Sequence, residues 1–124
     1  MRIALAQINP TIGDISGNLK KHLEALAAAR GQGAEVVLFP ELSILGYPPK
    51  DLLLKPSLLK LAAEAVERIA DAAGEITAVV GYAEKNRAAT GRPLHNAVAV
   101  VSNGQVVAVA NGPLREKTPV QHVV

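Results

Sequence analysis

Two amphipathic stretches separate three short apolar runs in the first two thirds of the chain, and this alternation constrains the fold more than any other feature. The apolar runs span residues 2–9, 35–39 and 76–83 and have the length of buried strands. The stretches between them place apolar residues three and four positions apart, as one face of a helix requires. The order predicts strands joined by helical crossovers, which is typical of α/β proteins with parallel strands.

The first predicted helix begins at Asp14 or Ser16, whose side chains can accept backbone N–H bonds, and ends near residues 31–33. We expect His22 to face solvent. The second predicted helix begins at Pro56 and ends near Ala73, before a glycine. The apolar stripes of the two helices are Leu19, Leu23, Leu26 and Ala27 in the first, and Leu59, Ala62, Val66, Ile69 and Ala73 in the second.

Two more strands are expected at residues 94–101 and 105–110. Asn103-Gly104 between them is a strong signal for a short β-hairpin. Helical crossovers followed by a hairpin give a mixed sheet of about five strands, and we expect both helices on one face of it. The predicted fold class is therefore α/β.

Composition narrows the functional classes. The 124 residues are 49% hydrophobic and 19% charged, which is typical of a soluble globular domain. The formal net charge is +2 and the basic residues are scattered, so we expect no nucleic-acid partner. No apolar run approaches the roughly 20 residues that span a bilayer, and the N-terminus does not resemble a signal peptide. We expect a cytoplasmic protein without a membrane partner.

The sequence also limits cofactors and nucleophiles. It contains no cysteine, which excludes disulfides, thiolate zinc sites and a thiol nucleophile within these residues. Its three histidines are far apart and lack acidic residues at ligand spacing, so we expect no metal site. It has no glycine-rich phosphate loop, so we expect no cofactor site in this segment.

The sharpest local feature is Phe39-Pro40-Glu41-Leu42, where an acid follows the end of a buried strand. A long segment with four prolines, residues 40–56, begins there, and long ordered loops at strand ends often form functional sites. A carboxylate held against apolar neighbours would be partly desolvated, which suits a general base near neutral pH. The residues alone leave open the alternative that Glu41 is a surface or helix-capping glutamate.

This segment resembles the carbon–nitrogen hydrolases of the nitrilase superfamily, in which a Phe-Pro-Glu-Leu segment follows the second strand. The continuation from Gly46-Tyr47 to Leu54 is similar to the version in amidase domains of bacterial glutamine-dependent NAD synthetases. Residues 3–14, Asn18 and the strand start Leu94-His95-Asn96-Ala97 resemble the same group. The resemblance runs from residue 2 to about residue 111, and it implies part of an α-β-β-α sandwich.

The resemblance also implies a chemistry. In this family a cysteine thiolate attacks an amide, a glutamate acts as general base, and a lysine stabilises the oxyanion. Glu41 takes the place of the catalytic base. Tyr47 is a candidate for the substrate pocket, although a packed loop aromatic is at least as good an interpretation. The implied substrate is L-glutamine or another small amide, and homo-oligomers are expected for the intact protein.

In the synthetases the ammonia passes to a separate domain, so ATP and Mg²⁺ are implied only for that domain, which this segment lacks. The segment also departs from the family pattern. Gly112 falls where the resemblance places the lysine, and Lys117 lacks the Leu-Pro context that follows that lysine. We therefore divide the chain into a carbon–nitrogen hydrolase part, residues 1–111, and a divergent or truncated tail, residues 112–124.

Three interpretations remain. The chain is part of a synthetase amidase domain, part of a stand-alone nitrilase-like amidase, or a non-catalytic fragment. Without the lysine and the cysteine we expect no activity from these residues alone. We also expect the partial sheet to leave an apolar face and an open edge uncovered, so that the chain aggregates or dimerises.

Overall fold

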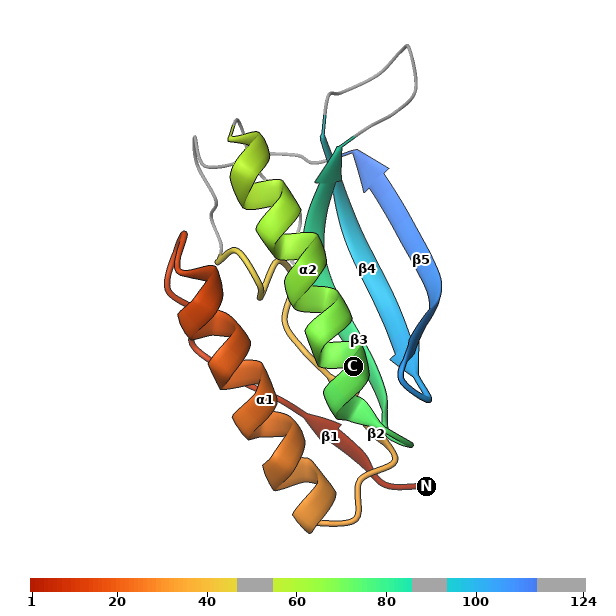
Figure 1. The fold of residues 1–124 in the computed structure, drawn as a ribbon. Coiled ribbons are helices and arrows are strands. Elements are labelled where there is room, and N and C mark those ends of the chain that lie inside the picture. Colours follow the sequence, from red (N-terminus) through yellow and green to blue (C-terminus); the bar gives the residue numbers. More distant parts are fainter. Residues whose placement is uncertain (47–54, 86–93, 114–124) are drawn as a thin grey trace.

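The computed structural model describes residues 1–46, 55–85 and 94–113, and it forms one mixed sheet with two helices on one face (Figure 1). The strands pair in the order β1-β2-β3-β4-β5, parallel from β1 to β3 and antiparallel from β3 to β5. The predicted fold class is confirmed. The elements are β1 (Ile3–Leu5), α1 (Ile15–Gly31), β2 (Val36–Leu38), α2 (Pro56–Ala73), β3 (Thr77–Lys85), β4 (Leu94–Ser102) and β5 (Gln105–Pro113).

The helix ends follow their sequence signals. The Asp14 carboxylate accepts a hydrogen bond from the backbone N–H of Gly17, at 3.0 Å, and caps α1. Gly74 ends α2 with a φ of 57°, in the region that glycine tolerates best. Arg30, in the last turn of α1, donates to the carbonyl oxygens of Ala72 and Ala73 at 2.7 and 3.1 Å. This guanidinium therefore ties the two helix ends together.

The strands differ from the prediction mainly in length. β1 is shorter than the predicted run of residues 2–9, and its last link to the sheet is the hydrogen bond from Ala6 N–H to the Leu38 carbonyl, at 2.8 Å. β5 extends to Pro113 rather than to residue 110. Asn103 and Gly104 have φ values of 53° and 76°, which is the conformation of a type I′ hairpin turn. The predicted hairpin is confirmed.

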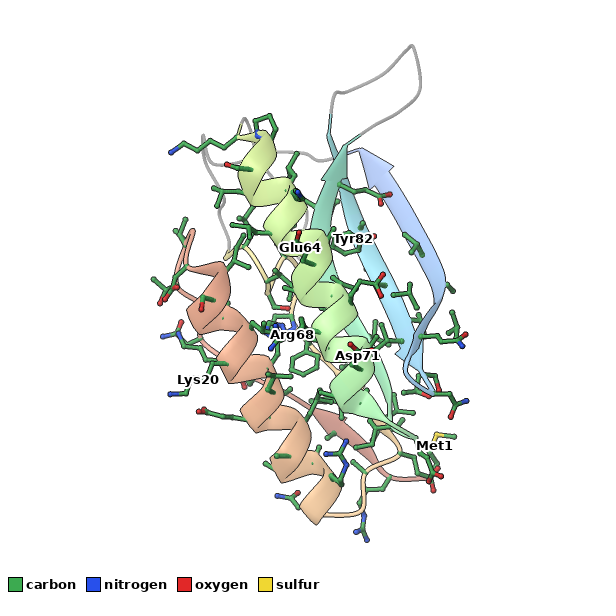
Figure 2. All side chains as sticks on the ribbon, in the orientation of Figure 1. Met1, Lys20, Glu64, Arg68, Asp71 and Tyr82 are labelled. Carbon is green, nitrogen blue, oxygen red and sulfur yellow. The ribbon has the colours of Figure 1, made fainter. Side chains whose placement is uncertain are left out.

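The core lies between the helices and the sheet and consists mostly of Ala, Val, Leu and Ile. Tyr82 of β3 is buried beside α2 (Figure 2), and its hydroxyl donates to the Glu84 carboxylate at 3.1 Å. Burial raises the pKa of Tyr82 to about 12, and the negative charges of Glu84 and Glu67 act in the same direction. The inward-facing residues of the long strands include Ala78, Val80, Ala97, Ala99 and Val101, all fully buried.

The opposite sheet face, here called the outward face, carries apolar side chains that are open to solvent. Ile3 and Leu5 of β1 are 54% and 70% exposed, and Val98 of β4 is 37% exposed. The register places Gly81 opposite Val98 and Ala83 opposite Asn96, so these four residues share this face. The described structure therefore shows the uncovered apolar face that we expected.

Candidate active site

Glu41 lies three residues beyond the end of β2, at the edge of the sheet where β3 ends and β4 begins. Phe39 prolongs the pairing, because its N–H donates to the Val79 carbonyl at 3.0 Å. Asn96, 55 positions away in sequence, donates a side-chain N–H to the Glu41 Oε1 atom. The fold thus brings Glu41 together with a residue to which the sequence assigned no role.

The expectation that Glu41 is partly desolvated is wrong for the described chain. Glu41 is exposed, whereas Leu42 and Ser43 directly after it are fully buried. The physical reason lies in the sheet, because Glu41 meets Asn96 on the outward face, which the helices do not cover. The resemblance implies a second sheet on this side, and shelter for the carboxylate would have to come from there.

Residues 40–46 form a tight turn that fixes the position of Glu41. Leu42 has a φ of 50°, a left-handed conformation that is uncommon for a residue with a branched side chain. The N–H of Gly46 donates to the Leu42 carbonyl at 2.8 Å. Gly46 has a φ of 92°, and a Cβ there would lie 2.7 Å from the Ile12 Cα. The turn therefore packs directly against the loop that precedes α1.

Gly81 of β3 supports the same turn from the outward face of the sheet. A Cβ on Gly81 would lie 2.6 Å from the Leu42 nitrogen and 2.8 Å from the Pro40 oxygen, distances that real Cβ contacts do not reach. The missing side chain lets the backbone on both sides of Glu41 rest on the strand. Any larger residue at position 81 must push the turn away.

His22 holds the turn from the helix side, and the prediction that it faces solvent is wrong. It is fully buried. Its Nδ1–H donates to the Asn18 carbonyl at 2.7 Å, which leaves Nε2 as an acceptor for the Ser43 hydroxyl at 2.8 Å. The ring also packs against Phe39, with the ring centroids 4.4 Å apart. Burial lowers the pKa of His22, although the hydrogen bond to Asn18 partly opposes this shift.

Asn18 completes the attachment of α1 to the loops. Its Nδ2 atom donates to the carbonyl oxygens of Thr11 and Ile44, and its Oδ1 atom accepts from the Thr11 N–H, each at 2.8 Å. Both Asn18 and His22 lie on the buried stripe that contains Leu26. Two polar residues four positions apart, followed by a leucine at the same spacing, were the only sequence signal for this arrangement.

Gly112 of β5 is the Cα partner of Asn96. The position at which the resemblance places the family's lysine is therefore next to Asn96, at the same edge of the sheet as Glu41. Tyr47, the candidate for the substrate pocket, and Lys117 lie outside the described residues.

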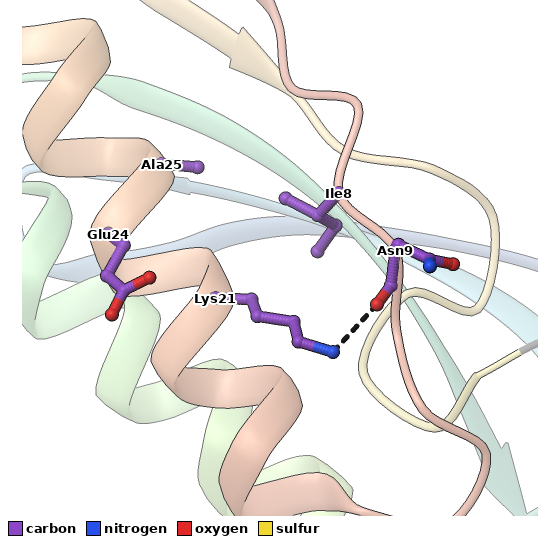
Figure 3. A pocket seen from close by; sticks show the side chains of 5 residues that line it. All are labelled: Ile8, Asn9, Lys21, Glu24 and Ala25. Carbon is purple, nitrogen blue, oxygen red and sulfur yellow. Dashed lines mark hydrogen bonds between the residues drawn. The ribbon is translucent and has the colours of Figure 1, made fainter.

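A separate hollow of about 560 Å³ lies between α1 and the chain after β1 (Figure 3). The Lys21 ammonium at its rim donates to the Asn9 carbonyl at 2.7 Å and reaches the Thr11 hydroxyl at 3.3 Å. This cation is thus already engaged within the protein. Residues lining the hollow are Ile8, Asn9, Lys21, Glu24 and Ala25.

Neither a metal cluster nor a membrane span is present in the part of the chain that the structure describes. No three His, Cys, Asp or Glu side chains in residues 1–46, 55–85 and 94–113 are placed to hold a metal ion. Neither α1 nor α2 is apolar enough over a sufficient length to cross a bilayer.

The chain belongs to the carbon-nitrogen hydrolase family, whose model matches residues 2–117. Within the family it is similar to glutamine-dependent NAD(+) synthetases. It is 39% identical to the synthetase of Thermotoga maritima over 111 residues, covering 88% of this chain and 18% of the relative. It is 42% identical to the synthetase of Xanthomonas campestris over 109 residues, covering 87% and 19%. The chain thus spans about a fifth of the length of these relatives.

Solved structures agree with this assignment. The glutamine-dependent NAD(+) synthetase of Cytophaga hutchinsonii superposes with a TM-score of 0.82 at 31% identity, covering 90% of this chain and 18% of that one. An amidase from Nesterenkonia sp. superposes with a TM-score of 0.74 at 28% identity, covering 90% and 42%. The described sheet and helices therefore form part of a carbon–nitrogen hydrolase domain.

Proposed function

We propose that the chain is the first part of a glutamine-amide hydrolase domain that supplies ammonia to an ATP-dependent NAD synthetase, with Glu41 as its general base. The observation that carries this proposal is the position of Glu41. Its carboxylate lies at the carboxyl end of β2, on a turn fixed by Gly81 and His22, within a fold shared with glutamine-dependent synthetases.

The chemistry requires two groups that this chain does not supply. A cysteine thiol gives its proton to Glu41, attacks the carboxamide carbon, and forms a thioester as ammonia leaves with a proton from Glu41. Glu41 then takes a proton from water, whose oxygen attacks the thioester carbon, and returns this proton to the cysteine sulfur as the carboxylic acid leaves. A lysine stabilises the oxyanion of each tetrahedral intermediate. In a structure of the E41L mutant of the Nesterenkonia amidase, the acetamide moiety of fluoroacetamide is attached at the active-site cysteine.

The proposed substrate is L-glutamine or another small amide, and Tyr47 is proposed to line its pocket. ATP and Mg²⁺ belong to a separate synthetase domain. For the intact protein we propose a cytoplasmic homo-oligomer. The second candidate function is that of a stand-alone amidase, which the likeness to the Nesterenkonia enzyme favours. A synthetase domain encoded downstream in the same gene would decide between the two.

The test is a graft in which residues 2–111 replace the matching segment of the Thermotoga maritima synthetase. We expect this graft to release ammonia from glutamine and Glu41→Gln to reduce the release at least 100-fold, because loss of a general base costs about 10²–10⁴-fold. Glu64→Gln, on the exposed side of α2, is the matched control and should leave the rate unchanged. An active Glu41→Gln graft would refute the role of Glu41, and we expect the 124-residue chain alone to release no ammonia.

A further inference from the structure

Hydrogen-bonding rules determine which atom of the Asn96 amide group lies next to the Glu41 carboxylate. An ionised carboxylate can only accept hydrogen bonds, so the Asn96 atom next to Glu41 Oε1 must be the amide nitrogen. The Oδ1 atom of Asn96 is therefore the amide atom that does not contact Glu41 Oε1. Asn96 lies on β4 between its register partners Ala83 on β3 and Gly112 on β5.

The Asn96 Oδ1 atom is buried and has no hydrogen-bond partner among the described residues. Proteins rarely leave a buried carbonyl oxygen unpaired, since doing so costs stability. An asparagine that served only the packing of β4 would be paired, or would be replaced by an apolar residue like its neighbours Ala97 and Val98. The unpaired oxygen indicates that the amide is kept for its contact with Glu41.

We infer that Asn96 is a positioning residue for Glu41, and this inference rests on the proposed function. Its N–H holds Oε1 and fixes the plane of the carboxylate. Oε2, which has no protein partner among the described residues, is then the oxygen that takes and returns the proton. Glu41 is otherwise exposed, so without this bond its side chain would rotate among several rotamers and would seldom present Oε2 to a nucleophile.

The first test uses the chain itself and needs no activity. Glu41→Ala, Asn96→Ala and the double variant are compared by urea unfolding at one fixed protein concentration, because the chain is expected to self-associate. We expect coupling, with the effect of the double variant on the unfolding equilibrium constant about two- to tenfold smaller than the product of the single effects. Multiplicative effects within error would overturn the inference.

The second test uses the synthetase graft. Asn96→Asp keeps the size of the side chain and removes the N–H donor. We expect a fall in kcat of about 10- to 100-fold with KM changed less than about threefold, because a misplaced reacting group slows the chemistry more than it weakens binding. Asn9→Asp, at an exposed asparagine on the chain after β1, is the control. The new carboxylate would also repel the negative charge of Glu41, so Asn96→Ala, which removes the donor without adding a charge, must show the same fall in kcat at a nearly unchanged KM.

The outcomes separate the two proposals. If Glu41→Gln abolishes activity and Asn96→Asp leaves kcat unchanged, the positioning role is wrong and the proposed function stands. If Glu41→Gln leaves activity intact, the proposed function is wrong, whereas coupling between the two positions in the urea experiment would still show that Asn96 holds the Glu41 side chain.

Discussion

The Nε2 atom of His22 accepts a hydrogen bond from the Ser43 hydroxyl at 2.8 Å, and this bond joins the middle of α1 to the turn that carries Glu41. Because Nδ1–H donates to the Asn18 carbonyl, the Nε2 atom of the neutral ring is the acceptor for the Ser43 hydroxyl. Burial disfavours a proton on Nε2, so the neutral form of His22 is favoured in the folded chain. The position of the catalytic candidate thus depends on a buried histidine.

We predict that acid destabilises the chain through His22. Burial lowers the pKa of His22 in the folded state, so the unfolded chain binds the proton more readily. The free energy of unfolding should therefore be constant above about pH 6.5, the ordinary histidine value, and should fall as the pH drops below it toward the folded-state pKa. The slope should be at most about 1.4 kcal/mol per pH unit for this one group. Urea unfolding between pH 5 and pH 8 measures it.

His22→Gln is the control for this prediction. It removes the titrating group, so the variant should lose stability at neutral pH and should show a flatter dependence between pH 5 and pH 6.5. Equal slopes for the two proteins would show that His22 is not responsible.

We predict that Gly81→Ala displaces the turn at Glu41. The new Cβ would meet backbone atoms of Leu42 and Pro40, which cannot rotate away as a flexible side chain can. Overpacking of this kind costs about 1–3 kcal/mol of unfolding free energy. Gly31→Ala is the matched control, because nothing lies within 4 Å of its Cβ position in α1, and it should be neutral or stabilising by about 0.5–1 kcal/mol. Equal effects at the two sites would contradict the close contact.

We predict that the outward face makes the chain self-associate. Ile3, Leu5 and Val98 present exposed apolar surface there, which is unfavourable in water. Leu5→Lys should lower the average mass measured by light scattering after size-exclusion chromatography at a given concentration. Leu61→Lys, which replaces an equally apolar exposed residue on α2, should leave that mass unchanged. A monodisperse monomer before any substitution would refute the prediction.

The periodicity of α2 predicted its buried side well, whereas that of α1 found Leu19, Leu23 and Leu26 at the core but missed two buried polar residues. In α2 the buried residues include Ala62, Val66 and Ile69 from the expected stripe. In α1 the buried side is centred on Asn18, His22 and Leu26, so Ala27 is exposed. Hydrophobicity cannot reveal this rotation, because the two polar side chains are buried only by virtue of partners in distant loops.

The candidate site likewise depends on a contact between distant residues that the sequence does not reveal. The motif around residues 39–42 was enough to single out Glu41, because an acid after a buried strand is a local pattern. Asn96 could not be paired with it from the sequence, since the pairing depends on the strand order and on the register of β3 with β4. The length of β1 was also overestimated, because an apolar run does not say where its pairing partner ends.

The turn at residues 40–46 contacts Asn18, His22 and Gly81, and Asn96 donates a hydrogen bond to the Glu41 carboxylate. All four of these contacting residues lie in one continuous stretch of chain, from residue 18 to residue 96. This stretch is therefore a segment that contains both the acid and the residues that position it. If it were exchanged between members of the family, it would keep the orientation of the carboxylate, and the host would contribute the nucleophile, the cation and the second sheet that shelters the carboxylate.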